Sequence, residues 1–423
     1  MQRTAVLAEP TQDKDAPMLS IRRVSCLVVT LIVSVLVTVW MGAPAVAQIR
    51  PTPPGTTPLF RLAVPRVAPL PESQWTNQHR DRVDRWSPEL RIGNAFRTLL
   101  HVPELVDAVM PFLIYTASDS TLPARDRELL ILRTAWLAQS SYLWAEHVPV
   151  ARAVGLTAGQ MRQIAVGPSA PEWTAFETTL LKLADELFRN SSVRDETWSA
   201  LESRYDLFNL VDAVMTVNQT TLLSMLFNSF GVQPDDSALA RFPGDVPYRV
   251  EVPDPEPPLS EPRVAPLEGP GIRVRRTFAR HPEMATARSG QSGYVNRVSP
   301  LPPYARELLI LRIGWNCQAV YEWAKHVGSV GRARDHGLEP ERIAQGPTAG
   351  WNLFDQAHLR AADEIYRDGI ISNATWAQLA EQYDTREMIS VVMTVANYRL
   401  VSMSLNALGV QPQETDELFP AVQ

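Results

Sequence analysis

Two glutamate–histidine pairs hold the residues of this chain that are best suited to chemistry. Glu128 precedes His147 by 19 residues, and Glu307 precedes His326 by the same number. In the second pair, Glu322 also stands one helical turn before His326. Burial raises the pKa of a carboxyl group and a nearby carboxylate raises that of an imidazole, so both groups can exchange protons near neutral pH. The pattern indicates general acid/base chemistry.

The second pair is the better candidate by residue type, because Leu143 replaces the extra glutamate in the first pair. The predicted catalytic residues are Glu307, Glu322 and His326, with a weaker site at Glu128 and His147. Tyr321 and Trp323 flank Glu322 and are predicted to contact a substrate. The alternative is structural: each glutamate pairs with an arginine, and each histidine is a hydrogen-bonded core residue.

The chain must reverse between each glutamate and its histidine. On one straight helix, the 19 residues would separate the two side chains by about 28 Å. Polar residues lie where a break is needed, at residues 139–141 in the first copy and at Asn316 in the second, and they are N-cap types. We therefore predict two helices packed back on one another, with the glutamate on the first and the histidine on the second.

Both pairs belong to a duplicated unit of roughly 150 residues, which is longer than the repeats of a solenoid. Matching motifs lie 179 residues apart, and 178 apart from Trp173 and Trp351 onward. A shared hexapeptide begins at Pro65 and again at Pro262, an offset of 197. Since 197 exceeds 179 by 18, the first unit carries about 18 extra residues, near positions 74–90.

The unit has the pattern of an all-helical bundle. Residues 128–137 are apolar on most faces, as in a buried helix. Asp206 and Asp384 are predicted N-caps, the second in a capping box with Glu387. Gly231 suits the left-handed position that follows a last helix. Strand signals are almost absent, so the predicted fold class is all-α.

The chain divides into six predicted segments. Residues 1–47 form a signal peptide or membrane anchor, and residues 48–90 a Pro-rich N-terminal arm. Two helical domains follow at 91–234 and 271–412, joined by a Pro-rich linker at 235–270 and followed by a tail at 413–423.

The N-terminal segment predicts export. Arg22 and Arg23 precede an apolar run, and an Ala-Val-Ala site ends at Ala47. We expect a signal peptide that is cleaved after Ala47, and a periplasmic or secreted protein. The alternative is an uncleaved membrane anchor over residues 26–42.

Composition limits the partners. The net charge of −6 comes without a basic stripe, which argues against nucleic acid and leaves a small-molecule substrate. Of the two cysteines, Cys26 lies in the N-terminal segment, so Cys317 has no disulfide partner in the mature chain. No metal is predicted, because Glu322 and His326 lack a third ligand and the first copy lacks the glutamate.

The motifs resemble those of the carboxymuconolactone decarboxylase-like family, which includes the alkylhydroperoxidase-D-type enzymes. The resemblance is carried by Arg-Glu-Leu-Leu-Ile-Leu-Arg at 306–312, Tyr-Glu-Trp-Ala-x-His at 321–326 and Leu-Asn-Ala-Leu-Gly-Val-Gln at 405–411. It covers residues 91–234 and 271–412. It implies two tandem helical bundles packed as an internal pseudo-dimer, and a homo-oligomer such as a trimer of tandem chains.

The hydroperoxidase branch of that family uses a Cys-x-x-Cys whose second cysteine stands four residues before the histidine. The matching positions here are Ser140 and Leu143 in the first unit, and Ala319 and Glu322 in the second. Without a dithiol, that peroxide-reducing cycle cannot run as in those enzymes. The resemblance therefore argues against peroxiredoxin-type activity.

The decarboxylase branch uses neither a thiol nor a cofactor. The resemblance then implies lyase-type chemistry on a small carboxylate or lactone, without a cofactor. In it His326 would protonate a carbanion or enolate, Glu307 would orient the imidazole, and Glu322 would be a second acid or base. Arg312 is the candidate clamp for a substrate carboxylate. The alternatives are a non-catalytic binding or scaffold protein of the same fold, and a peroxide reductase that uses Cys317.

Overall fold

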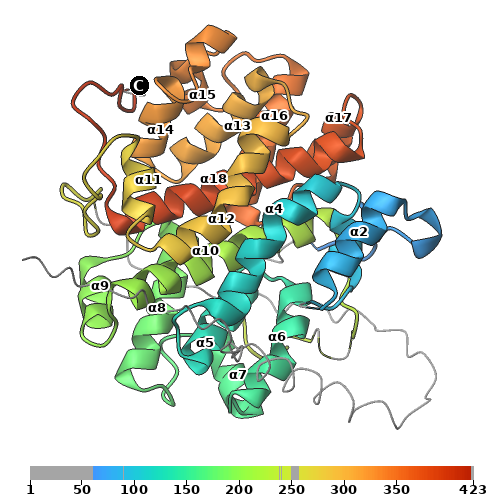
Figure 1. Ribbon diagram of the computed structural model, residues 1–423, viewed down its shortest axis with the longest axis vertical. Helices are drawn as coiled ribbons and strands as arrows, with labels where there is room; N and C mark the ends of the chain where they lie inside the picture. Colours follow the sequence, from blue (N-terminus) through green and yellow to red (C-terminus); the bar gives the residue numbers. More distant parts are fainter. Residues whose placement is uncertain (1–60, 89, 238, 240, 249–256, 421–423) are drawn as a thin grey trace, which may run out of the picture. The chain divides into compact units, whose positions relative to one another are not determined.

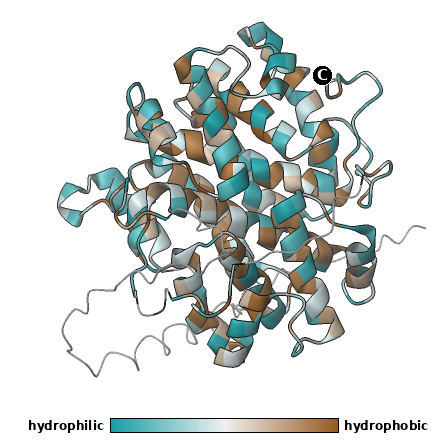
Figure 2. Cartoon of the chain, turned by 180° about the vertical axis from the view of Figure 1, so that it is seen from behind, coloured by the Kyte–Doolittle hydropathy of each residue, from teal (hydrophilic) through white to brown (hydrophobic). Residues whose placement is uncertain are grey.

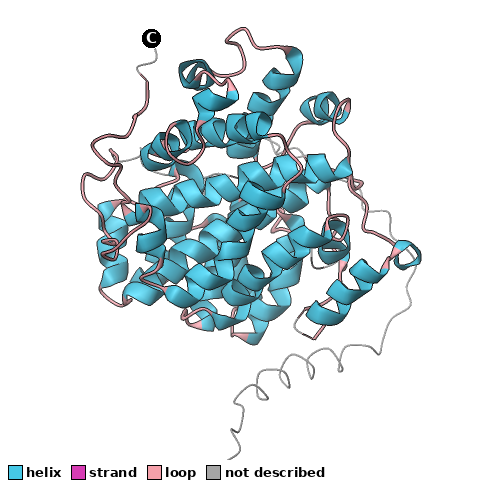
Figure 3. Ribbon diagram, turned by 45° about the horizontal axis from the view of Figure 1, so that its top comes forward, coloured by secondary structure: helices cyan, strands magenta, loops and turns pink. Residues whose placement is uncertain are grey.

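The computed structural model describes residues 61–88, 90–237, 239, 241–248 and 257–420. Figure 3 shows helices joined by loops throughout these residues, and no strand occurs among them. The predicted all-α fold class is confirmed. The predicted signal peptide or anchor lies outside the described residues.

The first repeat contributes eight α-helices and one π-helical turn to the described residues (Figure 1). They are α3 (Asn94–Leu99), α4 (Pro103–Ile114), the π-helical turn (Tyr115–Asp119), α5 (Ala124–Leu137), α6 (Ser141–Ala153), α7 (Ala158–Val166), α8 (Ala175–Asn190), α9 (Asp195–Glu202) and α10 (Leu207–Phe230).

The second repeat has the same order of helices and one additional 3₁₀ turn. They are α11 (Arg273–Phe278), α12 (Pro282–Gly293), a π-helical turn (Tyr294–Val298), α13 (Pro303–Asn316), α14 (Val320–Val327), a 3₁₀ turn (Ala333–His336), α15 (Pro340–Gln345), α16 (Leu353–Asp368), α17 (Asn373–Ala380) and α18 (Thr385–Leu408). All but α15 begin 178 or 179 residues after their counterparts, the offsets found in the sequence.

The insertion before the first repeat contains a helix that the sequence did not predict. After a 3₁₀ turn (Glu72–Gln74), α2 (Asn77–Trp86) forms within the segment expected to be an extended arm. Residues 72–87 contain no proline, and Thr76 begins α2 in a capping box with His79. The Pro-rich composition on either side obscured this signal.

Helices α10 and α18 are the longest and pack against each other where the two repeats meet. Nearly all their side chains are buried, whereas Figure 2 shows apolar and polar positions side by side on the outer helices. Their length and composition would allow them to cross a membrane, but both lie wholly inside this fold. The predicted caps are confirmed: Asp206 and Asp384 accept backbone N–H bonds, and Gly231 has a φ of +71°.

Polar side chains join the two repeats across this contact. Asn218 Nδ2 donates to Ser404 Oγ at 3.0 Å. Asn228 and Asn406 occupy matching positions near the ends of α10 and α18, and each donates to a backbone carbonyl of its own repeat and to one of the other. The repeats are therefore packed as the predicted internal pseudo-dimer.

Candidate active site

The predicted chain reversal occurs in both repeats. Helix α5 carries Glu128 and α6 carries His147, with the turn between them at Gln139, whose φ is +50°. The second repeat turns in the same way at Gln318, with a φ of +52°. The left-handed residue makes this break, because Ser140 forms no side-chain cap hydrogen bond to α6. The predicted side-chain capping at this turn is therefore wrong.

The structure brings the three predicted residues of the second repeat together. Glu307 Oε2 lies 2.6 Å from Nδ1 of His326, and Glu322 Oε1 lies 3.0 Å from Nε2. Arg306 contacts the other oxygen of Glu307 at 3.3 Å. Both nitrogens of the imidazole are thus engaged by carboxylates, and all three side chains are buried.

The charges of this cluster depend on each other. Burial by itself lowers the pKa of His326, but Glu307 and Glu322 outweigh it and raise the pKa to about 10. Burial likewise raises the pKa of Glu307, but His326 and Arg306 bring it below its ordinary value. At neutral pH the cluster is therefore an imidazolium held by carboxylates.

The imidazole of the second repeat is also enclosed. The ring of Tyr398 packs edge-on against His326, with centroids 4.9 Å apart, and its hydroxyl donates to Asn296. At Gly331 an added Cβ would lie 2.2 Å from Glu307 Oε2, so only glycine fits there. With a side chain 3% exposed, His326 offers no nitrogen to a ligand.

The first repeat contains the same glutamate–histidine pair, but here the histidine is partly exposed. Glu128 Oε2 lies 2.9 Å from Nδ1 of His147. The glutamate is 1% exposed and the histidine 20%. The imidazole lines a cavity of about 160 Å³. Because Nδ1 is bound to Glu128, Nε2 is the nitrogen available to a ligand in this cavity.

The carboxylate sets the charge of this imidazole. Burial by itself lowers the pKa of His147, but Glu128 outweighs it and raises the pKa above its ordinary value. Glu128 therefore favours the protonated, imidazolium form of His147. In that form the imidazole holds a proton that it can give to a bound substrate.

The wall of the cavity is mainly apolar, with a few polar groups. Phe96, Leu99, Leu143 and Phe227 belong to the apolar part, and the polar lining includes Arg91, Tyr142, Glu146, Gln219 and Thr220. Burial raises the pKa of Glu146 above its ordinary value. A small apolar cavity with a few polar groups is typical of a site for a small molecule.

Two residue exchanges explain why only one imidazole is open. Glu322 stands where the first repeat has Leu143, and it binds the nitrogen that His147 keeps free. Tyr398 stands where the first repeat has Thr220, which lines the cavity. The larger side chain fills that space in the second repeat.

The predicted substrate contacts of the second repeat are engaged elsewhere, which corrects the sequence prediction. The Tyr321 hydroxyl accepts the backbone N–H of Val274, and Trp323 packs in a separate apolar cluster with Trp315 and Phe419. Tyr321 stands five residues before His326 and is not its neighbour on the helix surface. Trp323 is one turn away, but its ring packs against Trp315 and Phe419.

Arg312 also has a structural role in place of the predicted one. Its guanidinium binds both oxygens of Asp363, at 2.6 and 3.0 Å, and two backbone carbonyls. Arg133 makes the same contacts with Asp185 in the first repeat. A guanidinium that already binds a carboxylate and two backbone carbonyls stabilises the fold and is not available to bind a substrate carboxylate.

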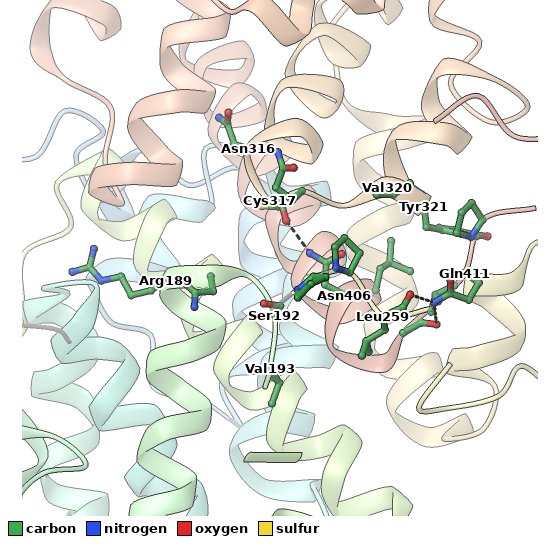
Figure 4. Close-up of a pocket in the computed structure, with 18 of the residues that line it drawn as sticks. Arg189, Ser192, Val193, Leu259, Asn316, Cys317, Val320, Tyr321, Asn406 and Gln411 are labelled. Atoms are coloured by element: carbon green, nitrogen blue, oxygen red, sulfur yellow. Dashed lines mark hydrogen bonds between the residues drawn. The ribbon is translucent and has the colours of Figure 1, made fainter. Parts of the chain in front are cut away.

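Cys317 lies beside a different cavity, of about 420 Å³ (Figure 4). Figure 4 shows Asn406 reaching the Cys317 carbonyl, a hydrogen bond of 2.8 Å. The residue is 1% exposed, and burial raises the pKa of its thiol. A buried, protonated thiol is a poor nucleophile, so the structure gives no support to a reaction at this residue.

The thiol is expected to be inert in the folded protein. In a Cys26→Ser chain, which leaves Cys317 as the sole thiol, a disulfide reagent such as Ellman's should release almost no chromophore until urea is added. Rapid release of one equivalent from the native protein would show instead that Cys317 is accessible and activated.

Apart from His147, none of the polar residues that line the first cavity was predicted from the sequence, and Arg91 and Gln219 are two of them. Neither belongs to a recognisable motif, and each reaches the site from an element far from the glutamate–histidine stretch. Within the described ranges, no group of three or more His, Cys, Asp or Glu side chains is arranged to hold a metal ion.

The first repeat thus holds a buried glutamate on one helix against a histidine on the next helix. The carboxymuconolactone decarboxylase family model matches residues 103–186, from the start of α4 into α8. This segment contains Glu128 and His147. The match confirms, for this segment of the first repeat, the family resemblance predicted from the sequence.

One solved structure is similar to part of the chain. It is described as the alkylhydroperoxidase AhpD core, an uncharacterized peroxidase-related protein from Ralstonia eutropha JMP134. It is 20% identical with a TM-score of 0.36, over 43% of this chain and 98% of that chain, and at that score the likeness carries no argument. No curated protein matches the chain.

Proposed function

We propose that the first repeat performs cofactor-independent acid/base chemistry of the lyase type on a small carboxylate or lactone. One observation carries the proposal. His147 has one nitrogen on buried Glu128 and faces a cavity, whereas His326 has both nitrogens bound to carboxylates. The residue types predicted an active site in the second repeat, whereas the geometry supports an active site in the first repeat.

The proposed reaction is a decarboxylation followed by protonation. In a substrate whose carboxylate is conjugated with a carbonyl, the bond from carbon to the carboxylate breaks and CO₂ leaves. The electron pair passes into the carbonyl, which becomes an enolate. The enolate carbon then takes the proton from Nε2 of His147, and water returns a proton to the imidazole. Glu128 holds the ring in place and stabilises its charged form.

Arg91 is the group best placed to contact a substrate carboxylate. It lines the cavity, its side chain is 63% exposed, and it lies 3.7 Å from Glu146 and 3.9 Å from Asp235. These distances are longer than hydrogen bonds, so the guanidinium can turn towards a substrate. The apolar wall would hold the remainder of a small ring and keep water from the enolate.

The sealed cluster of the second repeat suits a structural role. The imidazole of His326 binds Glu307 and Glu322 and is covered by the ring of Tyr398, so we propose that this repeat supports the first one. If neither repeat is catalytic, the chain is a binding or scaffold protein of the same fold. Peroxide reduction is disfavoured, because Cys317 is buried and the other cysteine of the sequence, Cys26, lies in the N-terminal segment that we propose is cleaved.

We further propose that the chain is exported, with cleavage after Ala47, and that it assembles into a homo-oligomer. The Ala-Val-Ala site supports the first statement, and the resemblance to the family supports the second. N-terminal sequencing of the mature protein and light scattering test them. An intact N-terminus would favour the anchor over residues 26–42.

Turnover of carboxymuconolactone tests the function. The purified protein should consume it and release one CO₂ per molecule, with no added cofactor or thiol. A parallel assay with a hydroperoxide and a dithiol donor should show no consumption. Absence of turnover with carboxymuconolactone and with related keto-acid lactones would support the scaffold alternative, and consumption of hydroperoxide would overturn the lyase proposal.

A further inference from the structure

Gln219 is a buried amide that faces the cavity of the first repeat. It lies on α10, is 1% exposed and belongs to the cavity lining. Its Oε1 accepts a hydrogen bond of 3.0 Å from Nε2 of Gln291, which lies on α12 in the second repeat. Its own Nε2 has no hydrogen-bond partner in the described part of the chain.

An unpaired buried donor needs an explanation. Leaving such a group without a partner costs about 1–3 kcal/mol, and native structures contain few of them. A ligand with an acceptor oxygen in the cavity would supply the missing partner. In the contact with Gln291 the oxygen of Gln219 is occupied and its N–H groups remain to donate, while Oε1 of Gln291 also has no partner in the described residues.

The arrangement belongs to the first cavity alone. The positions that match Gln219 and Gln291 in the other repeat are Asn397 and Phe112, so no equivalent amide pair forms there. Phe112 is fully buried in the core and carries no hydrogen-bonding group. The pair therefore does not follow from the repeat architecture. The matching Asn397 is also buried, with an amide that has no hydrogen-bond partner in the described residues, but it does not line this cavity.

We propose that Nε2 of Gln219 donates a hydrogen bond to the substrate's carbonyl oxygen and stabilises the charge on that oxygen as the enolate forms. This inference rests on the proposed function and deepens it, because it requires a substrate carbonyl in the cavity. Fixed donors aimed at a developing oxyanion lower a barrier most in a water-poor, apolar setting. Gln291 is a positioning residue, so the second repeat completes the site of the first.

The charges around the cavity agree with an anionic oxygen. Glu128 favours the imidazolium form of His147, Gln219 supplies an amide donor, and the surrounding wall is mainly apolar. Glu128 compensates the imidazolium from the opposite side of the ring, through Nδ1. An enolate oxygen would thus find donors on two sides, whereas a neutral hydrocarbon would leave the amide unpaired.

Binding of 4-nitrophenolate tests this role without the need for a substrate. The phenolate is a small planar ring with an enolate-like oxygen, and its absorbance reports binding directly. The wild-type protein should bind it, and Gln219→Met should weaken binding about ten- to a hundredfold, as expected for one hydrogen bond to a charged group. Gln219→Glu keeps the acceptor and removes the donor, so it should weaken binding at least as much.

Two further variants separate donation from packing. Gln291→Met should weaken binding by a smaller factor, because the amide is released but still present. Asn397→Leu, at the matching position of the second repeat, should leave binding unchanged. Equal affinity in wild type and Gln219→Met, with both folded by circular dichroism, would overturn the inference.

Turnover supplies an independent readout. If the wild type decarboxylates carboxymuconolactone, Gln219→Met should lower kcat by about 10²–10³-fold with KM little changed. If it does not, the proposed function fails, while the loss of nitrophenolate binding in Gln219→Met still supports Gln219 as the oxyanion donor of this cavity.

Discussion

Replacing His147 with glutamine is expected to lower kcat for the decarboxylation of carboxymuconolactone by about 10²–10⁴-fold, the range for loss of a positioned acid or base. KM should change little, because the apolar wall and Arg91 remain. Glutamine fills the space of the imidazole and still reaches Glu128, but it cannot give a proton to an enolate. Steady-state kinetics with both proteins at the same pH measure the effect.

The matching change in the second repeat is the control. His326→Gln should lower the free energy of unfolding, because it leaves buried Glu307 and Glu322 without their cation. Its kcat, measured on folded protein at low temperature, should stay within a few-fold of wild type. The opposite pattern, loss of turnover in His326→Gln alone, would assign the chemistry to the second repeat.

The free energy of unfolding is expected to fall as the pH rises from about 6.5 towards 10. The pKa of His326 is about 10 in the folded protein, above its ordinary value of 6.5. A raised pKa gives stability that is fully present below the unfolded pKa and is lost as the pH rises through the folded one. Since each pKa unit corresponds to about 1.4 kcal/mol, the total loss is of the order of several kcal/mol.

Urea denaturation at closely spaced pH values between 6 and 10 measures this slope. His147 contributes in the same direction, so a variant is needed to isolate the second repeat. Glu322→Gln keeps the shape and removes one of the two carboxylates that raise the pKa of His326. Its loss of stability should therefore begin at the same pH, near the unfolded pKa of 6.5, but should be smaller and level off at a lower pH than in the wild type. Coincident pH profiles for wild type and Glu322→Gln would show that the buried cluster is not charged as described.

The sequence was sufficient for those parts of the site that depend on local pattern. The 19-residue spacing predicted that Glu128 meets His147 and that Glu307 meets His326, and both contacts occur. The chain reversal between them was predicted as well, although a left-handed Gln139 makes the first turn where a side-chain cap was expected. Such features follow from helix geometry and need little tertiary information.

The openness of each site depends on residues distant in sequence. By residue type, Glu322 adds a second acid or base to the site. In space, it binds the free nitrogen of His326 and closes the site. Tyr398 completes the closure from α18, more than 70 residues further along the chain, and its size matters only because α18 packs against α14. Access to a side chain is a property of packing, which a motif does not specify.

The amide pair of Gln219 and Gln291 is a second example. The two glutamines are 72 residues apart and lie in different repeats. Neither glutamine belongs to a periodic pattern of polar residues in the sequence. The residue at the matching position of the opposite repeat is of a different type in each case. Only the docking of α12 beside the first repeat brings them together.

One substitution in each repeat tests most directly which glutamate–histidine pair is catalytic. Leu143→Glu places a carboxylate one helical turn before His147, as Glu322 stands before His326, and it should occupy Nε2 and abolish turnover of carboxymuconolactone. Glu322→Leu, the reverse exchange, should leave kcat within a few-fold of wild type. Full turnover in Leu143→Glu, together with its loss in Glu322→Leu, would contradict the placement of the active site in the first repeat.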